Sequence, residues 1–195
     1  MDIYVGVDPG SKNCALVAWS PTRGLITTWK PTGSMPTGVL RLRRIMVEID
    51  RELFKLKEDG EICKIAMEGY SMFEKFGQHA SGEVGAAIKL TILGCFDAQD
   101  PRAYPLIVQP QTLKKFVSGS GNTRKDMIPK EILKRWAMDF NDPNIAEAYA
   151  LARVAHAFDV EPEMPKFQQE VIKGLAGHTE YDPTFTTRRL VRVGR

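Results

Sequence analysis

Residues 3–12 read IYVGVDPGSK, an apolar run that ends in the carboxylate of Asp8 and a Pro-Gly turn. Further apolar runs at residues 15–19 and 25–29 predict a meander of short strands, because Pro, Gly and Asn separate them. The first run is apolar throughout, which predicts a central strand buried on both faces. Asp8 would end that rigid strand, a position that suits a catalytic group. Asp-Pro-Gly is also good turn chemistry, so this stretch alone leaves a purely structural Asp8 open.

The composition bounds the class of protein. The 195 residues are enough for one substantial domain with an extension, and 43% hydrophobic with 26% charged residues is ordinary for a soluble globular chain. A net charge of +3 does not by itself indicate a nucleic-acid partner. No apolar run approaches the roughly 20 residues that cross a membrane, and no secretory signal is visible. Three isolated cysteines, without zinc or disulfide spacing, predict the reduced cytoplasm.

A second carboxylate ends a second predicted strand. Apolar positions from residue 42 to 56 repeat at helical spacing and predict an amphipathic helix, which Gly60 ends. The strand at residues 62–67 then leads into Glu68 and Gly69. A helical connection makes a parallel crossover onto the first strand plausible. We therefore expect Asp8 and Glu68 side by side at one edge of the sheet.

Residues 70–76 place three aromatic rings directly after this acid. Exposed rings beside a basic groove stack on unpaired bases, and Tyr70 and Phe73 are the candidates. The alternative is that the rings fill the core. The following residues, 78–96, predict a long helix whose many small residues suit close packing against the sheet or a second subunit.

Basic residues flank a Gly-Ser loop that follows a short predicted strand at residues 106–108. The pairs are Lys114-Lys115 and Arg124-Lys125, with Gly119 to Gly121 between them. Backbone amides and lysines in such a loop suit phosphate oxygens. The loop lacks the spacing of a Walker motif, and a mobile surface loop with solvated charges is the alternative.

The last core helix begins at Asp142-Pro143, since Asp at the N-cap and Pro at the first position are a strong helix start. Glu147 follows within the first turn and a half, and Asn144 precedes it by three residues on the same side. The helix dipole also favours an acid there, so a structural role for Glu147 stays open. We assign residues 1–159 to one domain and residues 160–195 to a C-terminal extension, whose arginine-rich end would touch DNA or a partner.

Three separated acids, Asp8, Glu68 and Glu147, together fit a site for Mg²⁺, with Mn²⁺ as a substitute. Two such ions can activate water and stabilise the leaving oxygen in phosphodiester cleavage. The fourth ligand has two candidates. Charge favours Asp142, whereas geometry favours Asn144, because it shares a helix face with Glu147 and Asp142 already serves as the N-cap.

Taken in order, these motifs resemble the RuvC-type Holliday junction resolvases of the ribonuclease H-like superfamily. The matching pieces are residues 5–11, the strand that ends in Glu68, Gln111-Thr112 with the Gly119–Lys125 loop, and residues 144–152. The resemblance implies an α/β, ribonuclease H-like fold with a five-stranded mixed sheet flanked by helices. It also implies a homodimer that cuts four-way DNA junctions by paired, magnesium-dependent nicks, with Asp8, Glu68 and Glu147 as metal ligands.

The chain departs from this family at two places. The last family motif usually carries two acids three residues apart, and here Asn144 takes the first place, so its amide would ligate weakly. The aromatic wedge expected after Glu68 has two candidates. The DNA-binding residues that we predict are Lys12, Tyr70, Phe73, Lys114, Lys115, Arg124 and Lys125. Small chains of this type occur in bacteriophages, which extends the expected location to the host cytosol and the substrates to other branched DNA.

Two other classes of function remain to be weighed. Actin-like sugar kinases and ATPases also begin with a strand and Asp-x-Gly-Ser/Thr, but they need a duplicated domain and a far longer chain. A catalytically inactive DNA-binding module is the second alternative. Asn144 leaves it open, and the presence of Glu147 beside Asp8 and Glu68 argues against it.

Overall fold

The computed structural model, which describes residues 1–10, 13–69 and 78–175, has a five-stranded mixed sheet at its centre. The strand order is β3-β2-β1-β4-β5. The strands β1 (Asp2–Asp8), β2 (Ala15–Ser20) and β3 (Gly24–Trp29) form an antiparallel meander. The strands β4 (Glu61–Glu68) and β5 (Leu106–Val108) run parallel to β1. The predicted α/β architecture is confirmed.

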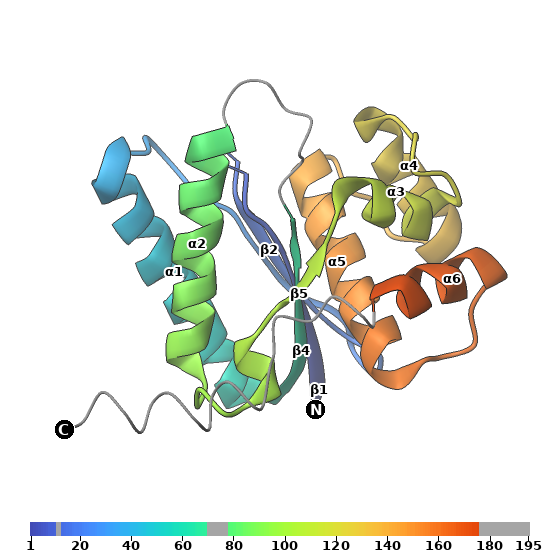
Figure 1. Ribbon diagram of the computed structural model, residues 1–195, viewed down its shortest axis with the longest axis horizontal. Helices are drawn as coiled ribbons and strands as arrows, with labels where there is room; N and C mark the ends of the chain where they lie inside the picture. The colour runs from blue at the N-terminus through green and yellow to red at the C-terminus, as the bar shows by residue number, and fades with distance from the viewer. Residues whose placement is uncertain (11–12, 70–77, 176–195) are drawn as a thin grey trace.

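Helices cover both faces of the sheet (Figure 1). One face carries α1 (Gly38–Asp59) and α2 (Gln78–Cys95). The other carries α3 (Pro110–Ser118), α4 (Ile128–Trp136), α5 (Pro143–Val160) and α6 (Lys166–Leu175). Two short 3₁₀ turns, η1 (Pro101–Ala103) and η2 (Lys125–Met127), join these elements. None of the helices in the described ranges is long and apolar enough to span a membrane.

The central strand β1 is buried because it contacts helices on both sides. Ile3, Val5 and Val7 belong to the core shared with α1 and α2, whereas Tyr4 belongs to the core shared with α5. Gly6 also faces α5, and a Cβ atom there would overlap the carbonyl oxygen of Ala148. The absence of a side chain at Gly6 therefore lets α5 lie directly against β1.

Helix α6 lies beyond the domain boundary that we predicted at residue 159, yet it packs on the core. Val171, Ile172 and Leu175 are buried in the same cluster as α3 and α5. The Gln168 side chain donates a hydrogen bond of 2.8 Å to the carbonyl oxygen of Phe116 in α3, and this bond is buried. The first part of the C-terminal segment thus contributes a core helix.

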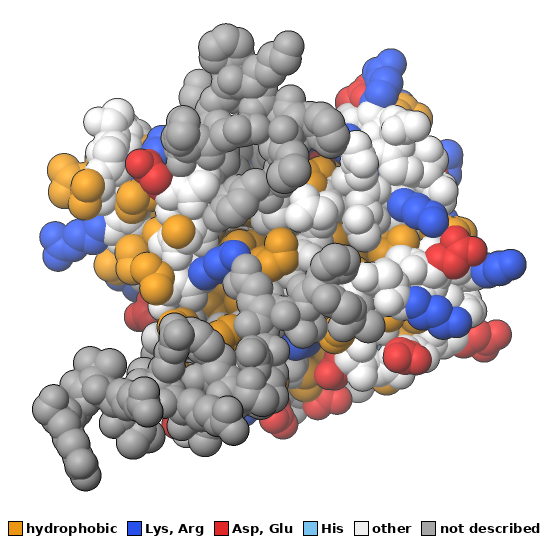
Figure 2. All heavy atoms as spheres, in the orientation of Figure 1, with side chains coloured by type: hydrophobic (Ala, Val, Ile, Leu, Met, Phe, Trp, Pro, Cys, Tyr) orange, Lys and Arg blue, Asp and Glu red, His pale blue; other side chains and the backbone are white. Residues whose placement is uncertain are grey.

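Hydrophobic side chains remain exposed on the opposite face of the molecule, on α1 and α2. Figure 2 shows them gathered over these two helices. Leu40, Val47 and Phe54 are spaced by seven residues on α1, and Phe54 is 63% exposed. Leu90 of α2 is exposed as well. We refer to Val39, Leu40, Val47, Phe54 and Leu90 as the α1–α2 apolar surface.

Candidate active site

Two acids lie at the same edge of the sheet, as predicted. Strands β1 and β4 are parallel, and Val7 pairs with Met67, so Asp8 and Glu68 end adjacent strands. Directly after Glu68 the amide of Gly69 donates a 2.8 Å hydrogen bond to the carbonyl oxygen of Val108, at the end of β5. A Cβ atom on Gly69 would lie 2.8 Å from Nε2 of Gln109. Because residue 69 is a glycine, the side chains of Ile107 in β5 and of Gln109 just after it can lie against the backbone that follows Glu68.

Helix α5 brings the third acid to this edge. Asp142 caps the helix, and its Oδ1 accepts hydrogen bonds from the amides of Asn144 (2.9 Å) and Ile145 (3.3 Å). Lys30, which follows β3, forms an ion pair with the other oxygen of Asp142. Burial raises the pKa of Asp142, but the hydrogen bonds from Lys30 and from the two amides outweigh burial and lower it. Asp142 is thus engaged as a cap, and Glu147 follows in the buried part of the helix, where it is 4% exposed.

The Lys125 ammonium lies among these acids. Its Nζ is 2.6 Å from Oε2 of Glu147 and donates a hydrogen bond of 3.2 Å to Oδ1 of Asn144. Burial lowers the pKa of Lys125, whereas the contact with Glu147 and the charges of Asp8 and Glu68 raise it, and the net change is upward. In the described part of the chain, no three His, Cys, Asp or Glu side chains come together as a ready-made metal site. The three carboxylates instead share Lys125 as a neighbour.

Asp8 is the most perturbed carboxylate of this group. It is 3% exposed, and burial followed by the negative charge of Glu147 raises its pKa to about 7. The charge of Lys125 and a 3.1 Å hydrogen bond from the amide of Gly10 act in the opposite direction. Strong shifts of this kind are frequent at functional sites, although structural networks also produce them.

Two buried carboxylate oxygens at this edge differ in their partners. Oδ2 of Asp8 is buried without a hydrogen-bond partner, whereas Oε2 of Glu147 has the Lys125 ammonium 2.6 Å away. Leaving a buried carboxylate oxygen unpaired is costly, so Oδ2 of Asp8 indicates a missing partner. Carboxylates with an amide oxygen suit Mg²⁺ or Mn²⁺. The donor types of Asp8, Glu68, Glu147 and Asn144 therefore suit a divalent ion, but the described residues do not gather them into a formed metal site.

Comparison with solved structures identifies the architecture. The chain matches the structure of Thermus thermophilus RuvC with a TM-score of 0.63 and 14% sequence identity, over 91% of this chain and 98% of that one. It also matches T. thermophilus RuvC in complex with a Holliday junction substrate, with a TM-score of 0.62 and 14% identity, over 91% and 97% of the two chains. The chain has a RuvC-like fold. No protein-family model and no curated protein sequence matches it.

In this RuvC-like fold, the predicted DNA-binding residues fall in different environments. Lys125 contacts Glu147 and Asn144, as described above. Arg124 forms an exposed ion pair with Asp126. Lys114 is half-buried on α3. Lys12, Tyr70 and Phe73 lie outside the described residues, so the structure says nothing of the aromatic wedge.

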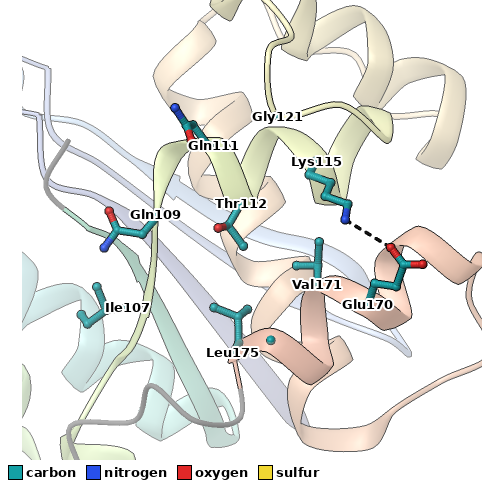
Figure 3. Close-up of a pocket in the computed structure, with 10 residues that line it drawn as sticks. Ile107, Gln109, Gln111, Thr112, Lys115, Gly121, Glu170, Val171 and Leu175 are labelled. Atoms are coloured by element: carbon teal, nitrogen blue, oxygen red, sulfur yellow. Dashed lines mark hydrogen bonds and ion pairs between the residues drawn. The ribbon is translucent and has the colours of Figure 1, made fainter. Parts of the chain in front are cut away.

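Lys115 points from α3 toward Glu170 (Figure 3). Its Nζ forms a 3.2 Å ion pair with Glu170 of α6. Both residues line a cavity of about 640 Å³ between the start of α3 and α6, shown in Figure 3 together with Gln109 and Thr112. The pairing with α6 had no signal in the sequence, because residues 115 and 170 belong to helices whose packing is set by the whole fold.

The Gly-Ser loop between α3 and η2 is ordered by its own hydroxyl groups. Oγ of Ser118 lies 2.6 Å from Oγ1 of Thr123 and donates to the carbonyl oxygen of Ser120. Gly119 has a φ of 88°, the left-handed conformation in which glycine commonly ends a helix. The loop thus leads to η2, from which the Lys125 side chain reaches Glu147.

Proposed function

We propose that the protein is a magnesium-dependent endonuclease that cuts four-way DNA junctions by paired nicks. The observation that carries this proposal is the buried, unpartnered Oδ2 of Asp8, at the edge where β1 ends in a RuvC-like fold, with Glu147 and Lys125 beside it. Of the two solved RuvC structures described above, one contains a Holliday junction. Other branched DNA is included in the expected substrate class.

In this proposal the acids have distinct roles. Asp8, Glu68 and Glu147 hold the cation, and Asn144 adds a weak, uncharged oxygen ligand. Mg²⁺ supplies the chemistry that activates water and stabilises charge on the leaving oxygen. The rigid end of β1 and the capped start of α5 keep the carboxylates oriented, so little free energy is lost in reorganising them. Arg124 and Lys125 would face the phosphates from the loop before α4.

We also propose a homodimer, since two nicks on opposed strands of a two-fold substrate match a C2 dimer. The α1–α2 apolar surface is the proposed interface. Exposed apolar groups that gather on one face commonly mark an interaction site. A cytoplasmic location and a contact of the basic C-terminal end with DNA remain part of the same proposal.

A DNA-binding module without cleavage is the second candidate. The observation that favours it is Asn144, which places an amide instead of a carboxylate beside Glu147 and Lys125. A sugar kinase or ATPase is less well supported, because the described residues form one five-stranded sheet and not a duplicated domain.

A nicking assay tests the proposal. The protein is incubated with a labelled four-way junction, a replication fork and a linear duplex, with Mg²⁺ or EDTA, and ATP hydrolysis is measured in parallel. We expect symmetrical nicks in the junction with Mg²⁺ only. Asp8→Asn should abolish the nicks and leave junction binding intact or stronger, because it removes a metal ligand and a charge that repels phosphates. Junction binding without nicks by the wild type would favour the inactive module.

A further inference from the structure

The cavity between the start of α3 and α6 has a mixed lining (Figure 3). Its volume of about 640 Å³ is within the range of roughly 300–1,000 Å³ that small-molecule sites have. The buried side chains of Val171 and Leu175 are apolar, whereas Gln109, Gln111 and Thr112 contribute amides and a hydroxyl group. The cavity therefore suits a ligand with an apolar face and a polar edge.

The polar side chains of this cavity are free to bind such a ligand. In the part of the chain that the structure describes, the side chains of Gln109, Gln111 and Thr112 make no hydrogen bond. Both glutamines are exposed, so a ligand can reach them from outside. A glutamine amide donates through its nitrogen and accepts through its oxygen. It can therefore pair with an edge that presents an acceptor beside a donor, as the pairing edge of a nucleobase does.

The charge of the cavity favours a neutral ligand. Among the described residues that line it, the charged ones are Lys115 and Glu170, and their side chains pair with each other at 3.2 Å. Phosphate groups are usually bound by basic side chains, and the charge of this lysine is already balanced by its partner. A nucleobase carries no charge, so it fits the cavity better than a phosphate does.

The cavity also borders two segments that the proposed function places near DNA. Nε2 of Gln109 lies against Gly69, the residue after Glu68, where a Cβ atom would be 2.8 Å from this nitrogen. Gly121 of the Gly-Ser loop lies against Gln111, and a Cβ atom on Gly121 would be 3.1 Å from the Gln111 carbonyl oxygen. A DNA strand at this edge of the sheet would thus pass next to the cavity.

We propose that this cavity binds one unpaired nucleobase of the DNA junction. The amides of Gln109 and Gln111 and the hydroxyl of Thr112 face the edge of the base, and Val171 and Leu175 pack against its ring. Enzymes that turn a base out of the stack bind it by this combination of hydrogen bonds and apolar contacts. The inference rests on the proposed function for its DNA substrate, requires no metal ion, and gives the protein a preference for the base at one position of the junction.

Filling the cavity tests the inference. Gly174 of α6 lines the cavity, and a Cβ atom there meets nothing within 4 Å, so Gly174→Leu adds a side chain to open space. Gly94→Leu is the matched control. Gly94 likewise precedes the last residue of its helix and has nothing within 4 Å of a Cβ atom, but its helix, α2, covers the other face of the sheet.

The probe is a four-way junction in EDTA, with fluorescent adenine or cytosine analogues that brighten when unstacked. The analogues replace the bases around the crossover one at a time. We expect the wild type and Gly94→Leu to brighten the analogue at the same position. Gly174→Leu should lose this brightening and bind the junction about tenfold more weakly, which is the scale of one base contact. Gln111→Leu, which removes an amide and keeps the bulk, should reduce the brightening.

The outcomes separate this inference from the proposed function. If Gly174→Leu brightens the same base and binds as tightly as Gly94→Leu, the cavity holds no base, and only the inference is wrong. If the wild type binds the junction no better than a linear duplex, the proposed function is wrong and the inference fails with it. Circular dichroism melting establishes that each variant is folded. The double variant Gln111→Leu, Thr112→Val provides the same comparison without filling the cavity, and wild-type brightening by it would also contradict the inference.

Discussion

Gly6 of β1 and Ala148 of α5 are in such close contact that a Cβ atom on Gly6 would overlap the Ala148 carbonyl oxygen. Gly6 and Ala148 are both buried, so neither backbone can shift outward to relieve such an overlap. Asp8 lies two residues after Gly6 in β1, and Glu147 directly precedes Ala148 in α5. The approach of strand to helix thus sets the separation of two proposed metal ligands.

Gly6→Ala should therefore destabilise the protein and weaken the site. The methyl group meets backbone atoms, which cannot rotate away, and overpacking of this kind costs roughly 1–3 kcal/mol. Urea unfolding measures the loss of stability. Gly82→Ala is the control, because a Cβ atom there meets nothing within 4 Å and alanine is the better helix former. Equal stability of Gly6→Ala and the wild type would contradict the close packing.

The stability of the metal-free protein should depend on Asp8 and pH. Burial and the charge of Glu147 raise the pKa of Asp8 from 3.8 to about 7, so the folded state binds a proton more tightly than the unfolded state. The ionised form of Asp8 therefore costs stability, increasingly as pH rises from about 4 to 7. Asp8→Asn lacks this cost and should be the more stable protein above about pH 7, by up to about 4 kcal/mol.

Thermal melts in EDTA at several pH values check this. The difference between Asp8→Asn and the wild type should shrink toward about pH 4. Mn²⁺ should reduce it at high pH by stabilising the wild type alone. If the melting temperatures of the two proteins differed by the same amount at every pH, the pKa of Asp8 would not be raised in the folded state.

The residue that joins Glu147 at the metal should be Asn144 and not Asp142. Asp142 is occupied as the helix cap and by Lys30, whereas Asn144 directs its Oδ1 toward the site, where Lys125 contacts it. Asn144→Ala should raise the Mg²⁺ concentration needed for nicking, and Asn144→Asp should lower it. Asp142→Asn should lose little, because Asn also caps helices well.

Magnesium titrations of the nicking rate distinguish the two residues. Asp142→Ala adds a control for the cap, with an expected loss of about 1 kcal/mol in unfolding free energy and a nearly unchanged Mg²⁺ requirement. An inactive Asp142→Asn beside a normal Asn144→Ala would show that the fourth ligand is assigned to the wrong residue.

Phe54→Glu should convert the proposed dimer into a monomer. Phe54 is 63% exposed in the α1–α2 apolar surface, and two buried glutamates facing a two-fold interface would be strongly unfavourable. Sedimentation velocity measures the oligomeric state. Val160→Glu, at an exposed apolar position at the end of α5, is the matched control and should remain dimeric. A monomeric wild type, with and without junction DNA, would exclude the dimer altogether.

The sequence by itself determined the local features on which the fold depends. Apolar runs and their interruptions predicted the five strands, and the helical connection before β4 predicted that Asp8 and Glu68 end neighbouring parallel strands. Asp142-Pro143 predicted where α5 begins, and its periodicity placed Asn144 and Glu147 on one side. The strand, turn and cap predictions succeeded because they depend on backbone preferences and side-chain periods within about ten residues. The pairing of β1 with β4 followed from the general rule for parallel crossover connections.

Only the tertiary structure decided which charged side chains lie together at the site. Lys125 meets Glu147 across 22 residues of sequence, and Lys30 meets Asp142 across 112. Neither pair leaves a periodic pattern in the chain. The same holds for α6, whose Gln168 contacts Phe116. The sequence therefore did not show that a helix after residue 160 still belongs to the folded core. Such contacts depend on the packing of α3 to α6 on the sheet, where a buried charge finds its partner only after distant elements have come together.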